Sequence, residues 1–385
     1  MKSKLFVIVS LLLTLSFLMT ACGTSATPET ITVKETVVVK ETVVVPPTVV
    51  PPVEGQKDTL VSAYVMEAPV LDGNANDVAW TQAPELMLDI TTFGIDGYQM
   101  MVKSVYTDDM VYFLFQFPDT NMEAFRHAWA YDPATKTWAY LADDFGDEDE
   151  FGLWWNMTMP DYDKKGCGQT CHGDKMVAPT GTFADDWRWN SVRSNVMGWT
   201  RDFYMTDDPD ADGGPGGAGG FTKDDGYDTN RGYVDNTQDL NGVTMPAYWK
   251  PFSGSGGIIA GDPRYLLQSE IDSGLAKKIT AFDAATGELT DETGAIVPSW
   301  VAIPGYILSE PSGPSWNNIK AKGAWMNNVW TVEWSRALTT GFTDDIQFED
   351  LTATYYFDGY TKTRQPGESA HGWIPTTPLI FAPAD

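Results

Sequence analysis

The chain has 385 residues, with 53 acidic against 25 basic side chains and a formal net charge of −28. A surface with this charge repels nucleic-acid phosphates and anionic lipid headgroups, so it excludes nucleic-acid binding and membrane attachment through basic patches. Because 43% of the residues are hydrophobic and 13% are aromatic, the chain has enough apolar side chains to bury a sizeable core.

The first 21 residues have the features of a secretory signal peptide. Lys2 and Lys4 precede an apolar run over residues 5–19, which is too short for a membrane span and is followed by Thr20, Ala21 and Cys22. The stretch from Leu18 to Cys22 resembles the lipobox of bacterial lipoproteins, which implies cleavage before Cys22 and a lipid on that residue. The alternative is an ordinary cleaved signal followed by a chance cysteine. We expect an extracytoplasmic, membrane-anchored lipoprotein, in the periplasm or at the cell surface.

Residues 22–57 comprise this cysteine and a stalk rich in valine and proline. Residues 33–38 recur as residues 39–44, and two Pro-Pro pairs at 46–47 and 51–52 favour extended, polyproline-like backbone. The stalk cannot build a core, so we interpret it as a spacer that holds the globular part away from the bilayer.

Residues 58–385 form the globular part, in which short segments alternate apolar and polar residues with the period of a β-strand. Val111, Phe113, Phe115 and Phe117 share one face of such a segment. Long amphipathic helices are hard to find, and Gly, Pro and Asp separate the segments. This pattern predicts an all-β fold, an immunoglobulin-like antiparallel β-sandwich with long loops. The expected strands are 60–65, 85–90, 101–106, 111–117, 151–157, 265–268, 301–308, 330–334, 353–357 and 379–382.

The most informative motif is Cys167-Gly-Gln-Thr-Cys171-His172, in a chain with only three cysteines and three histidines. Two thiols that can add to the vinyl groups of haem, followed at once by an imidazole that can ligate iron, are typical of c-type haem attachment. The usual motif has two residues between the cysteines and this one has three. Thioether linkages are flexible enough to accept the larger loop, so the sequence favours covalent haem with His172 as an iron ligand.

Two other interpretations of the motif remain open. With Cys22 lipidated, Cys167 and Cys171 form an even pair outside the cytoplasm and could be joined by a disulfide, although closing so short a loop is often strained and stabilises little. A zinc site is less favoured, because zinc requires four ligands and the chain has no second tight cluster of cysteine and histidine.

A glycine- and aspartate-rich insertion covers about residues 206–242. Asp208, Asp210 and Asp212 alternate before Gly213, as in a calcium loop, but the twelfth position is Gly219 where a bidentate glutamate is required. A flexible acidic loop is the simpler interpretation, and a non-helical calcium site is the alternative.

Several segments over residues 60–382 together resemble the haem-binding domain family related to the γ subunit of ethylbenzene dehydrogenase. The resemblance implies a β-sandwich, similar to some carbohydrate-binding modules, that holds one haem and passes electrons. The segments are Ala68-Pro-Val-Leu-Asp-Gly73 with Val78-Ala-Trp80, residues 102–117 with Pro118-Asp-Thr120, Asp149-Glu-Phe-Gly-Leu-Trp154, Asp185-Asp-Trp-Arg-Trp189 with Arg193-Ser-Asn195 and Gly198, and Trp330-Thr-Val-Glu-Trp-Ser-Arg-Ala-Leu338.

The resemblance also implies a second way of holding haem. Related γ subunits bind a b-type haem without covalent attachment, through a methionine and a lysine. Their counterparts by position are Met176 and either Lys320 or Lys322. In this version the two cysteines of the motif form a disulfide. His172 and Met176 are too close in sequence to ligate opposite faces of one iron easily.

In the covalent version, which we favour because it gives His172 a role, the sixth ligand remains open. The candidates are Met197, Met245, His371 or a lysine brought in by the fold. Arg188 and Arg193 could pair with haem propionates through bidentate contacts, although such arginines more often pair with nearby carboxylates.

The sequence therefore predicts a lipid-anchored extracytoplasmic cytochrome that relays single electrons between redox partner proteins. No catalytic triad, glycosidase carboxylate pair, phosphate loop or dinucleotide fingerprint stands out, so we do not expect an enzyme in its own right. The alternative is a surface-displayed carbohydrate- or ligand-binding β-sandwich module in which the cysteines form a structural disulfide.

Overall fold

The computed structural model describes residues 58–92, 98–124, 126–141, 148–166, 177–211, 220–225, 227–251, 265–365 and 368–384. All of these residues belong to one compact unit of the chain. The fold is almost entirely β-structure, as the two-residue alternation predicted. The described helices α2 (Val78–Gln82), α3 (Tyr162–Lys165), α5 (Tyr227–Asn230) and α6 (Gln268–Asp272) have five residues or fewer.

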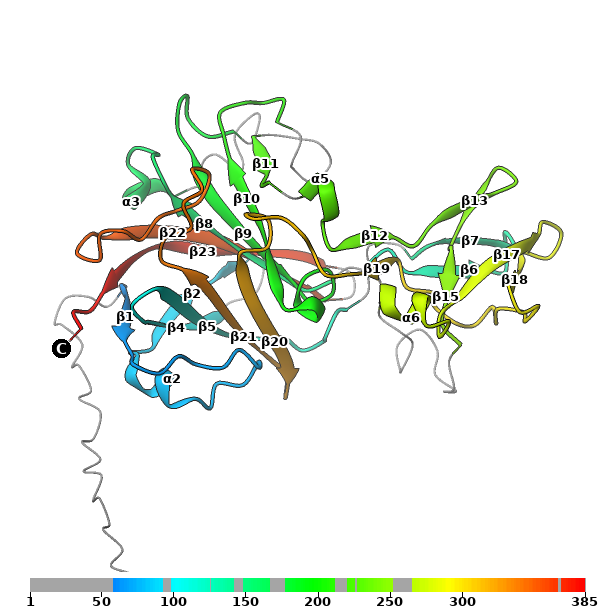
Figure 1. The fold of residues 1–385 in the computed structure, drawn as a ribbon, viewed down its shortest axis with the longest axis horizontal. Helices are drawn as coiled ribbons and strands as arrows, with labels where there is room; N and C mark the ends of the chain where they lie inside the picture. Colours follow the sequence, from blue (N-terminus) through cyan, green and yellow to red (C-terminus); the bar gives the residue numbers. More distant parts are fainter. Residues whose placement is uncertain are drawn as a thin grey trace, which may run out of the picture. The chain divides into compact units, whose positions relative to one another are not determined.

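One large sheet dominates the structure (Figure 1). β1 pairs with both β23 and β4, so the sheet closes on itself. Its strands, in spatial order, are β1 (Leu60–Tyr64), β23 (Glu368–Phe381), β22 (Tyr355–Gln365), β8 (Glu150–Asn156), β9 (Ala184–Asn190), β10 (Trp199–Met205), β20 (Ile319–Met326), β21 (Val329–Ala337), β5 (Met110–Pro118), β4 (Gln99–Tyr106) and β2 (Leu86–Asp89), with β3 (Thr91–Thr92) beside β23 and β11 (Phe221–Lys223) beside β10.

The neighbours in this sheet are antiparallel except for β1, which is parallel to both of its partners. The all-β sandwich expected from the sequence is confirmed. The parallel closure at β1 was not part of that expectation, and it depends on which strands meet in space.

The core lies between two layers of this closed sheet. Phe113 and Phe115 of β5 point at β8 and β9, where Phe115 packs on Phe151 with 4.9 Å between ring centroids. Phe151 in turn stacks on Trp334 of β21 at 4.6 Å with the rings nearly parallel. The four residues predicted to share a face of β5 all belong to this core, as do Trp330, Val332 and Trp334 of β21. Aromatic packing of this kind holds the layers together.

Two long connections carry smaller sheets. The connection from β5 to β8 forms the hairpin of β6 (Trp129–Asp132) and β7 (Thr137–Tyr140), and the connection from β10 to β20 forms the other small strands. The glycine- and aspartate-rich stretch is thus the first part of a longer connection. These strands are β12 (Tyr233–Asp235), β13 (Gln238–Leu240), β14 (Val243–Met245), β15 (Tyr248–Trp249), β16 (Leu266–Leu267), β17 (Lys277–Asp283), β18 (Glu288–Asp291) and β19 (Tyr306–Leu308).

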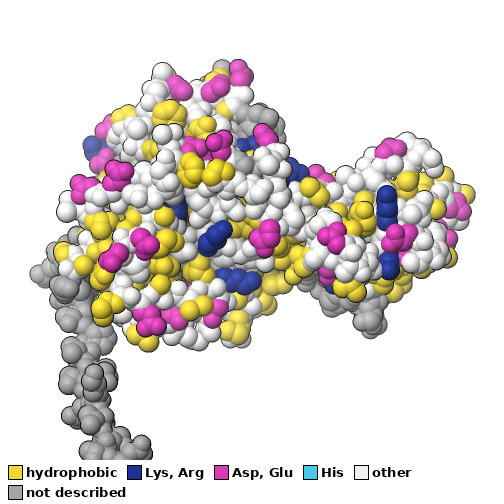
Figure 2. All heavy atoms as spheres, viewed as in Figure 1, with side chains coloured by type: hydrophobic (Ala, Val, Ile, Leu, Met, Phe, Trp, Pro, Cys, Tyr) yellow, Lys and Arg dark blue, Asp and Glu magenta, His cyan; other side chains and the backbone are white. Residues whose placement is uncertain are grey.

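The small sheets have a hydrophobic cluster of their own, built around Trp129, Trp138, Ile279 and Leu289. On the face shown in Figure 2, acidic side chains are spread over the surface without gathering over one element. None of the helices in the described ranges has the length and apolar character needed to cross a membrane.

Candidate functional site

The strands β22, β8, β9 and β10 turn alternate residues to opposite sides, as extended strands must. Phe151, Trp155 and Trp187 fill the core, whereas their sequence neighbours form what we call the outer face. Cross-strand register aligns Trp154 with Asp186, and Asp186 with Phe203, across this face. The outer face comprises Glu150, Trp154, Asp186, Arg188, Asn190, Arg201, Phe203, Tyr360 and Lys362.

The haem-attachment motif predicted from the sequence belongs to residues 167–176. Cys167, Cys171, His172 and Met176 therefore lie outside the described residues. The chain on both sides of this segment is described, and both sides contact the outer face or its margin.

Before the motif, the chain is fixed at the edge of the outer face formed by β22 and β23. The hydroxyl of Tyr162 in α3 donates a hydrogen bond to Asp358 Oδ1 at 2.6 Å. Gly166 has a φ of 60°, and a Cβ there would meet the side chains of Asp358 and Thr376. Only glycine combines this left-handed backbone with so close an approach. The residue directly before Cys167 thus lies against β22 and β23.

After the motif, the chain is fixed at the other edge of the outer face. The backbone N–H of Ala178 donates to the carbonyl of Thr206, which directly follows β10, at 2.9 Å. Ala178 also packs in a buried cluster with Trp154, Met205, Phe221 and Tyr360. The two flanks of the motif are therefore attached at opposite edges of one aromatic surface.

A buried ion-pair network covers the end of this face where β8 begins. Glu150 lies 3.5 Å from Arg201, 3.6 Å from Arg193 and 3.8 Å from Lys362, each measured between charged nitrogen and carboxylate oxygen. Tyr360 donates its hydroxyl hydrogen to the same carboxylate. Burial raises the pKa of Glu150, but the positive charges of Lys362, Arg201 and Arg193 outweigh burial, so the pKa lies well below its usual range.

Arg188 and Arg193, predicted as partners of haem propionates, hold ion pairs with carboxylates of the chain itself. Arg188 binds Asp186 and lies between Phe203 and Phe221, at 4.6 and 4.4 Å from the ring centroids. Arg193 binds Glu148. Their sequence-based role as propionate partners stays a prediction.

Arg201 was missed by the sequence analysis, and its Nε donates a hydrogen bond to Asn190 Oδ1 on the same face. Its only ion pair among the described residues is with Glu150, which Arg193 and Lys362 share. Burial raises the pKa of Tyr233, but the positive charges of Arg201, Arg193 and Arg231 outweigh burial. The pKa of Tyr233 therefore lies below its ordinary value. The sequence signal was an arginine inside an otherwise aromatic strand.

The other predicted ligands are spread over the fold. Lys322 lies in β20 in register with Glu333, and the amine of Lys320 donates to the carbonyl of Asn317 at 3.0 Å. His371 lies in β23 in register with Lys362, and its side chain is outside the described part. Met245 is buried in the hydrophobic cluster of the small sheets.

Met197 belongs to the short 3₁₀ helix Asn195–Met197 and packs against the cluster of Trp199 and Trp316. In the loop predicted as a possible calcium site, Asp208 accepts a hydrogen bond from the backbone N–H of Asp210 at 2.9 Å. Residues 212–219 of that loop lie outside the described residues.

Comparison with known proteins identifies the family. The model of the ethylbenzene dehydrogenase family matches residues 80–357, so the chain belongs to this family. This agrees with the resemblance seen in the sequence. No curated protein matches the chain.

Among solved structures, the chain is similar to a family 9 carbohydrate-binding module from Caldicellulosiruptor kristjanssonii in complex with glucose. The identity is 8%, the match covers 85% of this chain and 97% of the module, and the TM-score is 0.33. A protein from Bacteroides uniformis described as carbohydrate-binding has 7% identity, with 84% and 99% coverage and a TM-score of 0.34.

Proposed function

We propose that this chain is a lipid-anchored extracytoplasmic haem protein that relays single electrons between redox partners. The observation that carries the proposal is the attachment of both flanks of the Cys167–His172 motif at opposite edges of one aromatic surface. Membership of the ethylbenzene dehydrogenase family supports it. Cys22 would carry the lipid that holds the protein to the membrane.

The residues of the outer face suit haem. Cys167 and Cys171 would hold the porphyrin through thioethers, and His172 would ligate the iron. Trp154, Tyr360 and the partly buried Trp373 offer flat aromatic packing beside the flanks of the motif. Arg201 could pair with a propionate, because the carboxylate it contacts is shared. When bound, haem supplies reversible one-electron transfer at its iron.

The positions of the described residues favour covalent haem over the non-covalent version. Ala178, two residues after Met176, is bound at Thr206, whereas β20 pairs with β10 only at Trp199 and Thr200. Six residues along a strand correspond to roughly 20 Å. Lys322 lies beyond that pairing, so a haem ligated by Lys322 would lie far from Ala178.

The test is an optical spectrum and a haem-stained denaturing gel of the full chain, produced in a host that matures c-type cytochromes. We expect a red protein whose reduced spectrum shows haem bands and whose stain survives denaturation. The double variant Cys167→Ala/Cys171→Ala should lose the gel-stable haem. Gln169→Ala, which changes the motif without removing a thiol, should keep it.

The other possible results of this test would support either non-covalent haem or a carbohydrate-binding module. A double variant that still binds haem in solution, without gel-stable stain, would support non-covalent haem. A colourless wild-type chain would contradict the proposal and favour the carbohydrate-binding alternative, which binding assays with glucose and cello-oligosaccharides would then examine.

A further inference from the structure

Inside the sandwich, four aspartates gather next to the aromatic core. Asp185 of β9 has the same strand parity as Trp187, so it points into the core and away from the outer face. Asp202 of β10 lies directly opposite Trp187 in the register and points the same way. Asp345, from the loop after β21, and Asp224, after β11, complete what we call the core aspartate cluster.

The cluster has the dimensions of a cation site. One carboxylate oxygen each from Asp185, Asp202 and Asp345 lies within 4.8 Å of the others. The exposed fraction is 0% for Asp185 and Asp202, 1% for Asp345 and 3% for Asp224. Oxygens this close together are of the kind that surround one Ca²⁺ ion, which takes its oxygen ligands at about 2.3–2.6 Å.

The positive charge of the chain does not balance this cluster. Within the described residues its ion pairs come from Arg336, which contacts Oδ2 of Asp345 at 2.7 Å and Oδ2 of Asp185 at 3.4 Å. One guanidinium therefore faces four buried carboxyl groups. Uncompensated buried carboxylates cost several kcal/mol each, so proteins pair them, protonate them or bind them to metal.

A second observation is the set of carboxylate oxygens with no hydrogen-bond donor. Among the described residues, both oxygens of Asp202 and Oδ1 of Asp185 are buried without a hydrogen-bond partner. Asp224 does not belong to the three closest aspartates, but its Oδ1 is also buried without a hydrogen-bond partner. Its Oδ2 accepts a hydrogen bond from the Ser315 hydroxyl at 2.8 Å. The Ser315 hydroxyl is also 3.4 Å from Asp345 Oδ1, so Asp224 is directed at the cluster.

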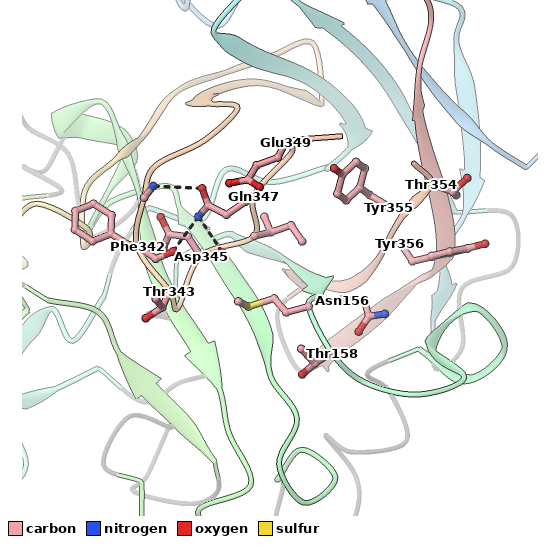
Figure 3. Close-up of a pocket in the computed structure, with 13 residues that line it drawn as sticks. Asn156, Thr158, Phe342, Thr343, Asp345, Gln347, Glu349, Thr354, Tyr355 and Tyr356 are labelled. Carbon is pink, nitrogen blue, oxygen red and sulfur yellow. Dashed lines mark hydrogen bonds between the residues drawn. The ribbon is translucent and has the colours of Figure 1, made fainter. Parts of the chain in front are cut away.

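Asp345 connects the cluster to a cavity at the surface of the sandwich. A cavity of about 640 Å³ is lined by the loop after β21, and Asp345 is part of its wall (Figure 3). Gln347 shapes this loop by accepting from the backbone N–H of Thr340 at 2.9 Å and donating to the carbonyl of Asp345 at 3.1 Å. The backbone N–H of Ile346 donates to Asp185 at 2.8 Å, which holds the loop on β9.

We propose that the core aspartate cluster binds one Ca²⁺ ion through Asp185, Asp202 and Asp345, with Asp224 in support. All available donors are carboxylate or hydroxyl oxygens, which hard divalent cations prefer and which zinc sites seldom use alone. Arg336 contacts the Oδ2 atoms of two aspartates, so it leaves Oδ1 of Asp185 and both oxygens of Asp202 for the ion. The proposal is independent of haem and concerns a place distinct from residues 208–219.

The test is equilibrium dialysis of the purified full chain with ⁴⁵Ca²⁺, together with thermal unfolding in Ca²⁺ and in a chelator. Ca²⁺ at 100 times its dissociation constant should raise the unfolding temperature by roughly 5 °C. Asp202→Asn, which keeps the side-chain shape, should weaken Ca²⁺ binding at least tenfold and reduce the thermal shift at the same Ca²⁺ concentration to about half or less. Glu349→Gln removes one negative charge from the same cavity wall and should change neither.

Three results would overturn the proposal: no bound Ca²⁺, no thermal shift, or equal binding by Asp202→Asn and wild type. The last would locate any ion elsewhere, such as at residues 208–219. If Asp202→Asn does not fold, the same measurements are made on Asp345→Asn, and wild type is unfolded with and without chelator. A folded wild type whose unfolding temperature changes with neither Ca²⁺ nor chelator would contradict the site.

Discussion

Two buried acidic side chains, Glu150 and Asp202, differ in how their negative charge is compensated. Glu150 is surrounded by Arg193, Arg201 and Lys362 and also accepts the Tyr360 hydroxyl. Asp202 has no hydrogen-bond donor among the described residues. The environment therefore keeps Glu150 ionised without help, whereas Asp202 requires a proton or a cation.

At the residue scale we predict that Glu150→Gln lowers the free energy of unfolding by about 3–5 kcal/mol at pH 7, because it leaves buried cations without their carboxylate. The pKa of Glu150 is depressed in the folded chain, so its stabilisation is present above pH 4.5 and is lost as the pH falls through the folded pKa. Urea unfolding from pH 3 to 7 should show the two proteins converging at low pH.

The control for this prediction is the exposed Glu288, whose change to Gln should alter stability by less than about 0.5 kcal/mol. If Glu150→Gln and Glu288→Gln have equal effects at pH 7, the ion-pair network contributes nothing measurable.

At the element scale, the segment that contains α2 is attached to the sheet through one carboxylate. Glu333 of β21 accepts from the indole of Trp80 at 2.8 Å and from the backbone N–H groups of Asp72 and Gly73 at 2.9 and 2.8 Å. Gly73 has a φ of 79°, and a Cβ there would be 2.8 Å from Ala324, so this turn requires glycine. A five-residue helix gains little stability by itself, so packing and these bonds hold it.

We predict that Glu333→Gln destabilises this segment by about 1–3 kcal/mol, since an amide cannot accept all three bonds without turning its own donors toward N–H groups. Hydrogen exchange should quicken at the amides of Asp72 and Gly73 while the core strands keep their protection. Glu85→Gln, which removes an exposed partner of Lys103, is the matched control. Unchanged exchange at both amides would mean that Glu333 does not hold the segment.

At the scale of the whole molecule, closure of the large sheet makes its first and last strands interdependent. β1 joins β4 to β23 across more than 300 positions of sequence separation, with Leu60 in register with Leu379 and completely buried. A sheet closed in this way exposes fewer unpaired strand edges. The described core begins at Leu60, directly after the stalk expected from the sequence.

We therefore predict that a fragment of residues 58–385 unfolds within about 2 °C of the full chain, a difference of less than 1 kcal/mol. The fragment should appear in the soluble fraction of producing cells, whereas the full chain with Cys22 should sediment with membranes. A large loss of stability would show that residues before 58 belong to the core. A full chain that stays soluble would count against the lipid anchor.

The limits of sequence-based prediction are visible in particular strands. Residues 111–117 and 330–334 alternate cleanly, and both were predicted with their core faces. β9 and β10 were not predicted as strands, because charged residues on both faces, such as Asp185, Asp186 and Arg188, interrupt the apolar alternation. Those same charged residues belong to the outer face and the core aspartate cluster. The strands that carry the functional candidates were therefore missed because the candidates themselves break the apolar alternation.

The sequence alone determined the β-rich class, the faces of the alternating strands, the motif of Cys167, Cys171 and His172, and the expected anchor at Cys22, because each depends on neighbours a few residues apart. The tertiary structure decided that β1 closes the sheet, that both flanks of the motif attach to one surface, and that Asp185, Asp202 and Asp345 meet. These features require strand order and register between segments as much as 319 residues apart, such as Leu60 and Leu379. Short-range periodicity carries no information about that pairing.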